Sequence, residues 1–126
     1  MTINRLFIVL CALLMISPAL SARTVIVPSA TFFSIQEAID SLATGDTILV
    51  DAPVLSGFGN RDINFNGKGI AVMAFNPGEP VTIDCQADLG NLHRAFIFES
   101  QEDSLAVLDG FRIINGYADS GGALYI

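Results

Sequence analysis

Cysteine, histidine and tryptophan are nearly absent from this sequence: 126 residues contain two cysteines, one histidine and no tryptophan. Cys11 lies in the apolar N-terminal stretch, so the rest of the chain has a single thiol, Cys85, and no internal disulfide can form there. No histidine and cysteine residues have the spacing of a zinc site. The stability of the fold must therefore come from packing.

Basic residues are also scarce, because six Lys and Arg stand against thirteen Asp and Glu, a formal net charge of −7. An acidic surface repels the phosphates of nucleic acids and of anionic membranes, which argues against either as a partner, and we expect no nucleic-acid partner. Only 15% of the residues are charged and 52% are hydrophobic. The chain is therefore too apolar to be disordered, and its length allows one domain at most.

Residues 1–22 (MTINRLFIVLCALLMISPALSA) have the three parts of a secretory signal peptide. Arg5 supplies the basic region, residues 6–16 form the apolar region, and residues 20–22 end a stretch of small residues. We therefore predict an exported chain, on the cell surface or in the extracellular space, with the periplasm as the alternative. Removing Arg5 leaves thirteen acidic against five basic residues, a net charge of −8.

Two other interpretations of this N-terminal stretch are less consistent with the sequence. A transmembrane anchor needs about 20 apolar residues, and the apolar run is shorter and is interrupted by Ser17 and Pro18. A lipoprotein would use Cys11, but this cysteine lies in the middle of the apolar region and follows Leu10 rather than a small residue. We expect no membrane span after cleavage.

Residues 23–45 are expected to form a short strand followed by a capping helix. The apolar run 24–28 is the strand, and Ser34 with Glu37 has the spacing of a capping box at the start of a helix. Gly45 is suited to the position after the helix. The sequence predicts an amphipathic helix over residues 35–44, with an apolar stripe formed by Ile35, Ala38, Ile39 and Leu42.

Residues 46–126 have no helical period and contain short runs rich in Val, Ile and Phe, bounded by Gly, Asn, Asp or Pro. The runs are 47–52, 62–65, 70–75, 81–85, 95–99, 105–114 and 123–126. An antiparallel sandwich and a coiled parallel solenoid both fit this pattern. Hairpin signals are weak, because Asn66-Gly67 precedes only one long run and Asp109-Gly110 lies inside a single apolar stretch, which counts against the sandwich.

The spacing within two runs favours the solenoid. Val81, Ile83 and Cys85 share one face of their strand. Phe111 and Asn115 share another face, with Arg112 opposite Phe111. An inward asparagine at a strand end is typical of a solenoid, in which stacked amides form hydrogen bonds from coil to coil.

SIQEAIDSLATGDTILV (residues 34–50) resembles the N-terminal cap and first strand of right-handed parallel β-helix proteins of the pectin-lyase-like type. GNRDINFNGKGIAV, VTIDCQ and VLDGFRIINGYADSGGALYI resemble successive strands and turns of exported bacterial members. Residues 121–124 are similar to the Gly-Gly-Ala-aliphatic repeat of polymorphic outer-membrane proteins. The companion Phe-x-x-Asn is absent, because Asn115 follows Phe111 one residue too late, and residues 51–60 lack a Pro-Gly-Thr-Tyr-like turn.

This resemblance implies an all-β solenoid, a right-handed parallel β-helix of few coils whose first coils are residues 46–126. A coil buries its apolar face only against neighbouring coils, so the ends of the stack need caps. The helix would cover the front, whereas residues 121–126 leave an open edge with Leu124 and Ile126 exposed. We therefore expect a truncated β-helix that binds further coils or associates with itself at this end. Partial coils that close on themselves or dimerise are the alternative.

Cys85 and His93 are the only candidates for a nucleophile and its base, since an imidazole activates a nearby thiolate. Cys85 lies on an apolar face and no third orienting residue stands out, so we expect a buried structural thiol and a surface histidine. The Gly-rich and Asn-rich segment 57–69 lacks the spacing of a phosphate-binding loop and is expected to be a loop that contains a strand.

Acidic and aromatic residues are the remaining candidates for a site. The resemblance implies carboxylates that hold Ca²⁺ or act as an acid and base, with Arg94 or Arg112 beside them in a lyase. Aspartate also recurs in turns for conformational reasons, which we favour here. The acidic candidates are Asp84, Asp88, Glu99, Asp103, Asp109 and Asp119. The aromatic candidates for stacking on sugars, for which core packing is the default, are Phe32, Phe33, Phe58, Phe96, Phe98 and Tyr117.

The sequence therefore predicts a non-catalytic N-terminal segment of a secreted or cell-surface β-helix protein, of the scaffold or adhesion type. The alternatives are a fragment of a polysaccharide lyase or hydrolase of the same fold, and a sugar-binding module. No residues form a complete catalytic constellation, so we assign no catalytic residues and no cofactor, with Ca²⁺ as the alternative.

Overall fold

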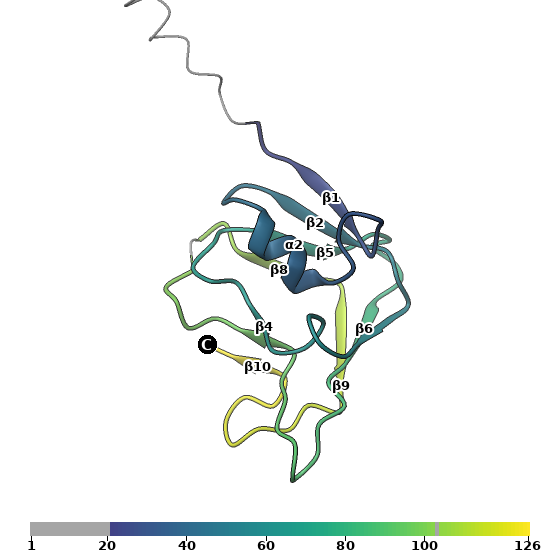
Figure 1. Ribbon diagram of the computed structural model, residues 1–126, viewed down its shortest axis with the longest axis vertical. Coiled ribbons are helices and arrows are strands. Elements are labelled where there is room, and N and C mark those ends of the chain that lie inside the picture. Colours follow the sequence, from purple (N-terminus) through teal and green to yellow (C-terminus); the bar gives the residue numbers. More distant parts are fainter. Residues whose placement is uncertain (1–20, 103) are drawn as a thin grey trace, which may run out of the picture.

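The computed structural model describes residues 21–102 and 104–126, which form parallel β-sheets and one short helix (Figure 1). Most of the predicted signal peptide (residues 1–20) and Asp103 lie outside the described residues. The elements are β1 Thr24–Val27, α2 Ile35–Ser41, β2 Thr47–Val50, β3 Val54–Ser56, β4 Ile63–Asn64, β5 Ala71–Ala74, β6 Val81–Asp84, β7 Phe96–Ile97, β8 Val107–Asp109, β9 Phe111–Ile114 and β10 Leu124–Tyr125.

The strands form three sheets, which the chain visits in turn. Sheet A has the order β1-β2-β5-β8, sheet B the order β3-β6-β9 and sheet C the order β4-β7-β10. We call one pass through the three sheets a coil, so β2-β3-β4, β5-β6-β7 and β8-β9-β10 are the first, second and third coils. Every pairing between these strands is parallel, which is compatible with a β-solenoid and excludes the antiparallel sandwich.

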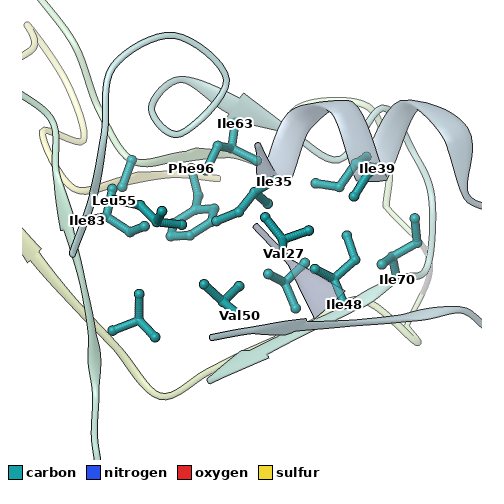
Figure 2. Packing of buried hydrophobic residues seen from close by; sticks show 14 of the residues in the cluster. Val27, Ile35, Ile39, Ile48, Val50, Leu55, Ile63, Ile70, Ile83 and Phe96 are labelled. Carbon is teal, nitrogen blue, oxygen red and sulfur yellow. The ribbon is translucent and has the colours of Figure 1, made fainter. Parts of the chain in front are cut away.

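Alternate side chains along the strands point into one shared core, as expected for strands with a single buried face. In sheet A, Ile48 pairs with Val72, and Val72 pairs with Leu108 of the third coil, so that apolar side chains stack from coil to coil. Ile48, Val72 and Phe96 are fully buried. Figure 2 shows Ile35 of the helix pointing into the same cluster of side chains.

Helix α2 covers the end of the first coil. Ser34 is its N-cap, and the Ser34 hydroxyl oxygen accepts a hydrogen bond from the Glu37 N–H at 3.2 Å. The Glu37 carboxylate accepts from the Phe33 N–H at 2.8 Å, one residue before the N-cap. The Ser34 half of the predicted capping box is therefore confirmed, whereas Glu37 bonds to the N–H of Phe33 instead of the N–H of Ser34. The apolar stripe, including Ile35 and Ile39, is buried against β1, β2 and β4.

The helix ends at Ser41, earlier than the periodicity predicted. Leu42 is buried but has an extended backbone, with φ −95° and ψ 168°. The Lys68 ammonium group donates hydrogen bonds to backbone oxygens at this end, those of Ile39 (2.7 Å), Asp40 (3.2 Å) and Leu42 (2.8 Å). A cation there satisfies free carbonyl groups and the helix dipole. This interaction comes from a distant part of the chain, which the helical period cannot reveal.

Two strand boundaries also differ from the predicted runs. Strand β3 lies in residues 51–60, where no strand was predicted, and it pairs with β6. The predicted run 105–114 is divided into β8 and β9 by Gly110, which has φ +80°. A Cβ atom at Gly110 would lie 2.6 Å from the Cβ of Ala74, so only glycine permits this corner. The corner leads the chain from sheet A to sheet B.

Candidate functional site

The third coil leaves a hollow of about 820 Å³ at its end of the stack. Most of the lining is apolar and comes from inward-facing side chains, and two glutamates add carboxylates to it. The residues that matter here are Phe98, Glu99, Glu102, Leu108, Leu124 and Ile126. We call this surface the open edge.

The open edge exists because inward side chains of the third coil have neighbours on one side only. Leu108 pairs with the fully buried Val72, and Leu124 pairs with the fully buried Phe96. Leu108 and Leu124 themselves are only half-buried, and Ile126 is 88% exposed. Within the described part of the chain, no strand pairs with the outer side of β8, β9 or β10. Such an edge presents unpaired amides and apolar groups to solvent.

At the other end of the stack, α2 covers the core and packs against β1, β2 and β4, while β1 and β3 are edge strands of their sheets. The Gln36 side-chain oxygen accepts a hydrogen bond from the Asn64 N–H at 2.7 Å, and its amide nitrogen donates to the Asn64 carbonyl oxygen at 3.0 Å. The amide therefore takes the place that a neighbouring strand would occupy beside β4. The buried Asn60 accepts from the Ile35 N–H at 3.1 Å, which fixes the start of the helix to the first coil. The two ends of the stack thus differ in how their backbone groups are satisfied.

A second hollow, of about 470 Å³, lies beside sheet C. The Arg94 guanidinium carbon is 4.8 Å from the centre of the Tyr125 ring, a cation–π contact. The Asp62 carboxylate accepts from the Arg94 backbone N–H at 3.0 Å and is hydrogen-bonded to His93 Nδ1 at 2.5 Å. Glu99, Asp119 and Ser120 complete the lining together with the apolar Leu92 and Ile97. An aromatic face beside a guanidinium group and carboxylates suits the hydroxyl groups and ring faces of a sugar.

Cys85 and His93 are each held by other groups. Cys85 is fully buried, and burial, together with the Asp62 and Asp84 carboxylates, raises the pKa of its thiol to about 11. The thiol is therefore protonated at neutral pH and is not a nucleophile. His93 is half-buried, with 19% of its side chain exposed; its Nδ1 bonds to Asp62 and its backbone exchanges two hydrogen bonds of 2.9 Å with Tyr117.

Two of the acidic candidates accept hydrogen bonds from the backbone of the turns that follow them. The Asp84 carboxylate accepts from the Gln86 N–H at 3.0 Å, and the Asp88 carboxylate accepts from the Gly90 N–H at 2.8 Å. Asp84 also accepts from the Asn115 side-chain amide at 2.9 Å. Asn115 therefore forms a hydrogen bond between coils, but with a carboxylate rather than with the stacked amide that was predicted. The prediction of an inward side chain is wrong because Asn115 is exposed.

The remaining acidic candidates are dispersed. Glu99 accepts from the Asn64 side chain at 3.3 Å, and Glu99 and Asp119 line the hollow beside Arg94. Asp109 is exposed on β8, and Arg112 is exposed on the outer face of β9. Within residues 21–102 and 104–126, no group of three or more His, Cys, Asp and Glu residues has the geometry to hold a metal ion.

The aromatic candidates divide into two groups. Phe96 is fully buried, Phe98 stacks on Phe65 with ring centres 4.5 Å apart, and Phe32 is half-buried, as core packing predicts. Phe33 and Phe58, however, are 72% and 101% exposed. Tyr117 is exposed beside His93. A sequence pattern could not separate these groups, because exposure of the two phenylalanines depends on the path of the loops around α2.

Comparisons with protein families, with curated protein sequences and with solved structures find no match for this chain. The pectin-lyase-like resemblance of the sequence therefore stays a prediction. In the part of the chain that the structure describes, no helix has the length and apolar character needed to cross a membrane.

Proposed function

We propose that this chain is a non-catalytic segment of an exported right-handed parallel β-helix protein, in which it forms the N-terminal cap and first coils of a scaffold or adhesion module at the cell surface. The difference between the two ends of the stack carries the proposal. Helix α2 covers the core at one end, where Gln36 bonds to the backbone of β4, whereas Leu108 and Leu124 stay half-buried at the open edge. A β-coil stacked there would bury them as Val72 and Phe96 are buried in the second coil.

Stacking at the open edge is favourable on elementary grounds. Fully burying an exposed leucine or isoleucine side chain stabilises an association by about 1.5–3 kcal/mol, and Leu108, Leu124 and Ile126 all line this surface. The strand edges would gain backbone hydrogen bonds at the same time. The partner that fits is another β-coil, from further coils of a β-helix or from a second copy of this chain.

The surroundings of the candidate catalytic side chains favour a scaffold role over an enzymatic one. Cys85 is buried with a pKa raised to about 11, and His93 is bonded to Asp62. Asp84 and Asp88 accept hydrogen bonds within their own turns. These groups therefore stabilise the coils in which they lie.

Sedimentation velocity over a range of concentrations tests the proposal. The purified chain is expected to associate, and Ile126→Lys is expected to weaken association, because it places a charge in the open edge. Ile126 is 88% exposed, so the substitution should leave the monomer stable. The matched control is Leu89→Lys, at an exposed aliphatic side chain outside the open edge, which is 82% exposed. A chain that stays monomeric, or equal effects of both substitutions, would contradict the proposal.

A polysaccharide-binding module of the same fold is the second candidate, and the hollow beside sheet C favours it. Tyr125 and Arg94 lie in contact there, next to Glu99 and Asp119. If polysaccharide binds in this hollow, Tyr125→Ala abolishes binding to a panel of acidic and neutral polysaccharides. Tyr117→Ala, at a tyrosine outside the hollow, does not. Repeating the assay with Ca²⁺ and with EDTA tests whether the carboxylates use the cation as a bridge.

A further inference from the structure

A groove of about 500 Å³ lies between α2 and the loop 57–60, at the end of the stack opposite the open edge. Phe33 and Phe58 flank it, and both side chains project into solvent. Grouped exposed apolar side chains on a soluble protein mark interaction surfaces. Neither the core nor the open edge accounts for these two residues. We call this surface the cap groove.

The loop that carries Phe58 is fixed in place. The Asn60 side chain is buried and accepts from the Ile35 N–H at 3.1 Å, so the loop is tied to the start of α2. A Cβ atom at Gly59 would overlap the Ser34 hydroxyl oxygen, and Gly59 has φ +82°. The loop backbone therefore lies directly against the helix cap. Because the loop backbone that carries Phe58 is already fixed, binding through this side chain requires little ordering of the backbone.

The cap groove is acidic. Its charged lining residues are Glu37 and Asp40, both exposed on α2. Glu37 accepts from the Phe33 N–H, and Asp40 accepts from the side-chain amides of Gln36 at 2.9 Å and Asn66 at 3.3 Å. Considering residues 21–102 and 104–126, neither carboxylate forms an ion pair. A carboxylate has about four acceptor positions, so both keep capacity for a cation.

We propose that the cap groove docks a segment of a partner protein in which apolar side chains are flanked by lysine or arginine. The rings of Phe33 and Phe58 cover the apolar side chains, and the flanking cations meet Glu37 and Asp40. In a twofold dimer the groove would face its own negative charge, which disfavours a second copy. An anionic membrane is disfavoured for the same reason.

Short synthetic peptides test this docking by fluorescence anisotropy with the full chain. One peptide has central leucines flanked by lysines, and its matched partners have glutamate or glutamine in place of every lysine. The lysine peptide is expected to bind, more weakly as salt increases, and the glutamate peptide is not. Phe58→Ser is expected to weaken binding at least about tenfold, whereas Leu89→Ser, at an exposed leucine outside the groove, has no effect.

Asp40→Lys is the charge-reversal variant, and it is expected to shift the preference toward the glutamate peptide. Urea unfolding of each variant confirms that the fold is retained. Equal binding of all peptides, or none at about 1 mM, overturns the proposal. Two further outcomes also overturn it: binding to phosphatidylcholine vesicles in place of the peptides, and self-association that Phe58→Ser abolishes. The open edge is at the other end of the stack, so a failure here leaves the sedimentation test unaffected.

Discussion

The side-chain amide of Gln36 forms two hydrogen bonds with the backbone of Asn64, accepting from its N–H at 2.7 Å and donating to its carbonyl oxygen at 3.0 Å. A residue of the helix thereby bonds to the edge of β4, with which no other strand of the described part of the chain pairs on that side. Exposed strand edges are templates for unwanted pairing, and this amide removes one such site.

Gln36→Ala is expected to lower the free energy of unfolding by about 1–3 kcal/mol, because both Asn64 groups lose a partner in a partly buried place. Urea denaturation followed by circular dichroism measures the change. Ser41→Ala, at an exposed position of the same helix, is the control and should stay within about 0.5 kcal/mol of the unmodified chain. Equal stability of Gln36→Ala and the control would show that the amide does not complete the sheet.

Asp46 is expected to make the free energy of unfolding depend on pH in the acidic range. Hydrogen bonds from the Ala43 N–H and then the Arg23 N–H lower the pKa of this buried carboxyl below its ordinary value of 3.8. The ionised form therefore stabilises the fold above pH 3.8, and this contribution is lost as the pH falls through the lower folded pKa. Asp46→Asn is expected to destabilise the chain at pH 7 and to lose most of that difference in strong acid. A difference that is constant with pH would contradict this account.

The predicted cleavage of the signal peptide would give the same carboxylate a further role. The backbone nitrogen of Arg23 lies 2.8 Å from Asp46 Oδ1. Cleavage after Ala22 would turn this nitrogen into an α-ammonium group and the hydrogen bond into a charge-assisted one. N-terminal sequencing of the exported chain should begin at Arg23. A chain that starts there should be more stable than one extended by a single alanine, and Asp46→Asn should remove that difference. An exported chain that retains residues 1–22 contradicts the predicted signal peptide.

Cys85 should be unreactive in the folded protein. Burial, and then the Asp62 and Asp84 carboxylates, raise the pKa of its thiol to about 11. Reaction with a disulfide reagent at pH 8 is therefore expected only in urea, with a rate that follows unfolding. Because the folded pKa is above the ordinary value of 9.0, stability should also decrease as the pH rises from 9 toward 11. Rapid labelling of the native chain would show that the thiol is accessible.

Much of the local structure could be predicted from short-range patterns. The apolar stripe and the Ser34 cap define α2, and alternating apolar residues such as Val81 and Ile83 identify strands with one buried face. Contacts between coils could not be predicted in the same way. The Gln36 and Asn64 pair is separated by 28 residues, and the Asp62 and His93 pair by 31, so no local spacing reveals them.

The sequence predicted the open edge but not the cap groove, because the cap groove depends on contacts between distant residues. The sequence predicted exposed side chains at Leu124 and Ile126; Ile126 is exposed, whereas Leu124 is half-buried because it packs on one side against the second coil. The cap groove depends on how the loop 57–60 passes over the helix cap, where Gly59 lies against Ser34. Its exposed Phe58 looks in the sequence like any other core aromatic residue. The exposure of Phe58 therefore depends on the tertiary contacts of its loop, which no local sequence pattern reveals.

Amide hydrogen exchange at low and high protein concentration, at physiological salt, tests the central claim most directly. The account predicts that the amides of β8, β9 and β10 exchange faster than those of β2 and β5 in the dilute chain. In the described part of the chain β2 and β5 pair with a strand on both sides, whereas β8, β9 and β10 pair on one side only. At high concentration β8, β9 and β10 should become protected, and Ile126→Lys should prevent it. Unchanged exchange in these strands, or new protection confined to another surface, would contradict a stacking role for the open edge.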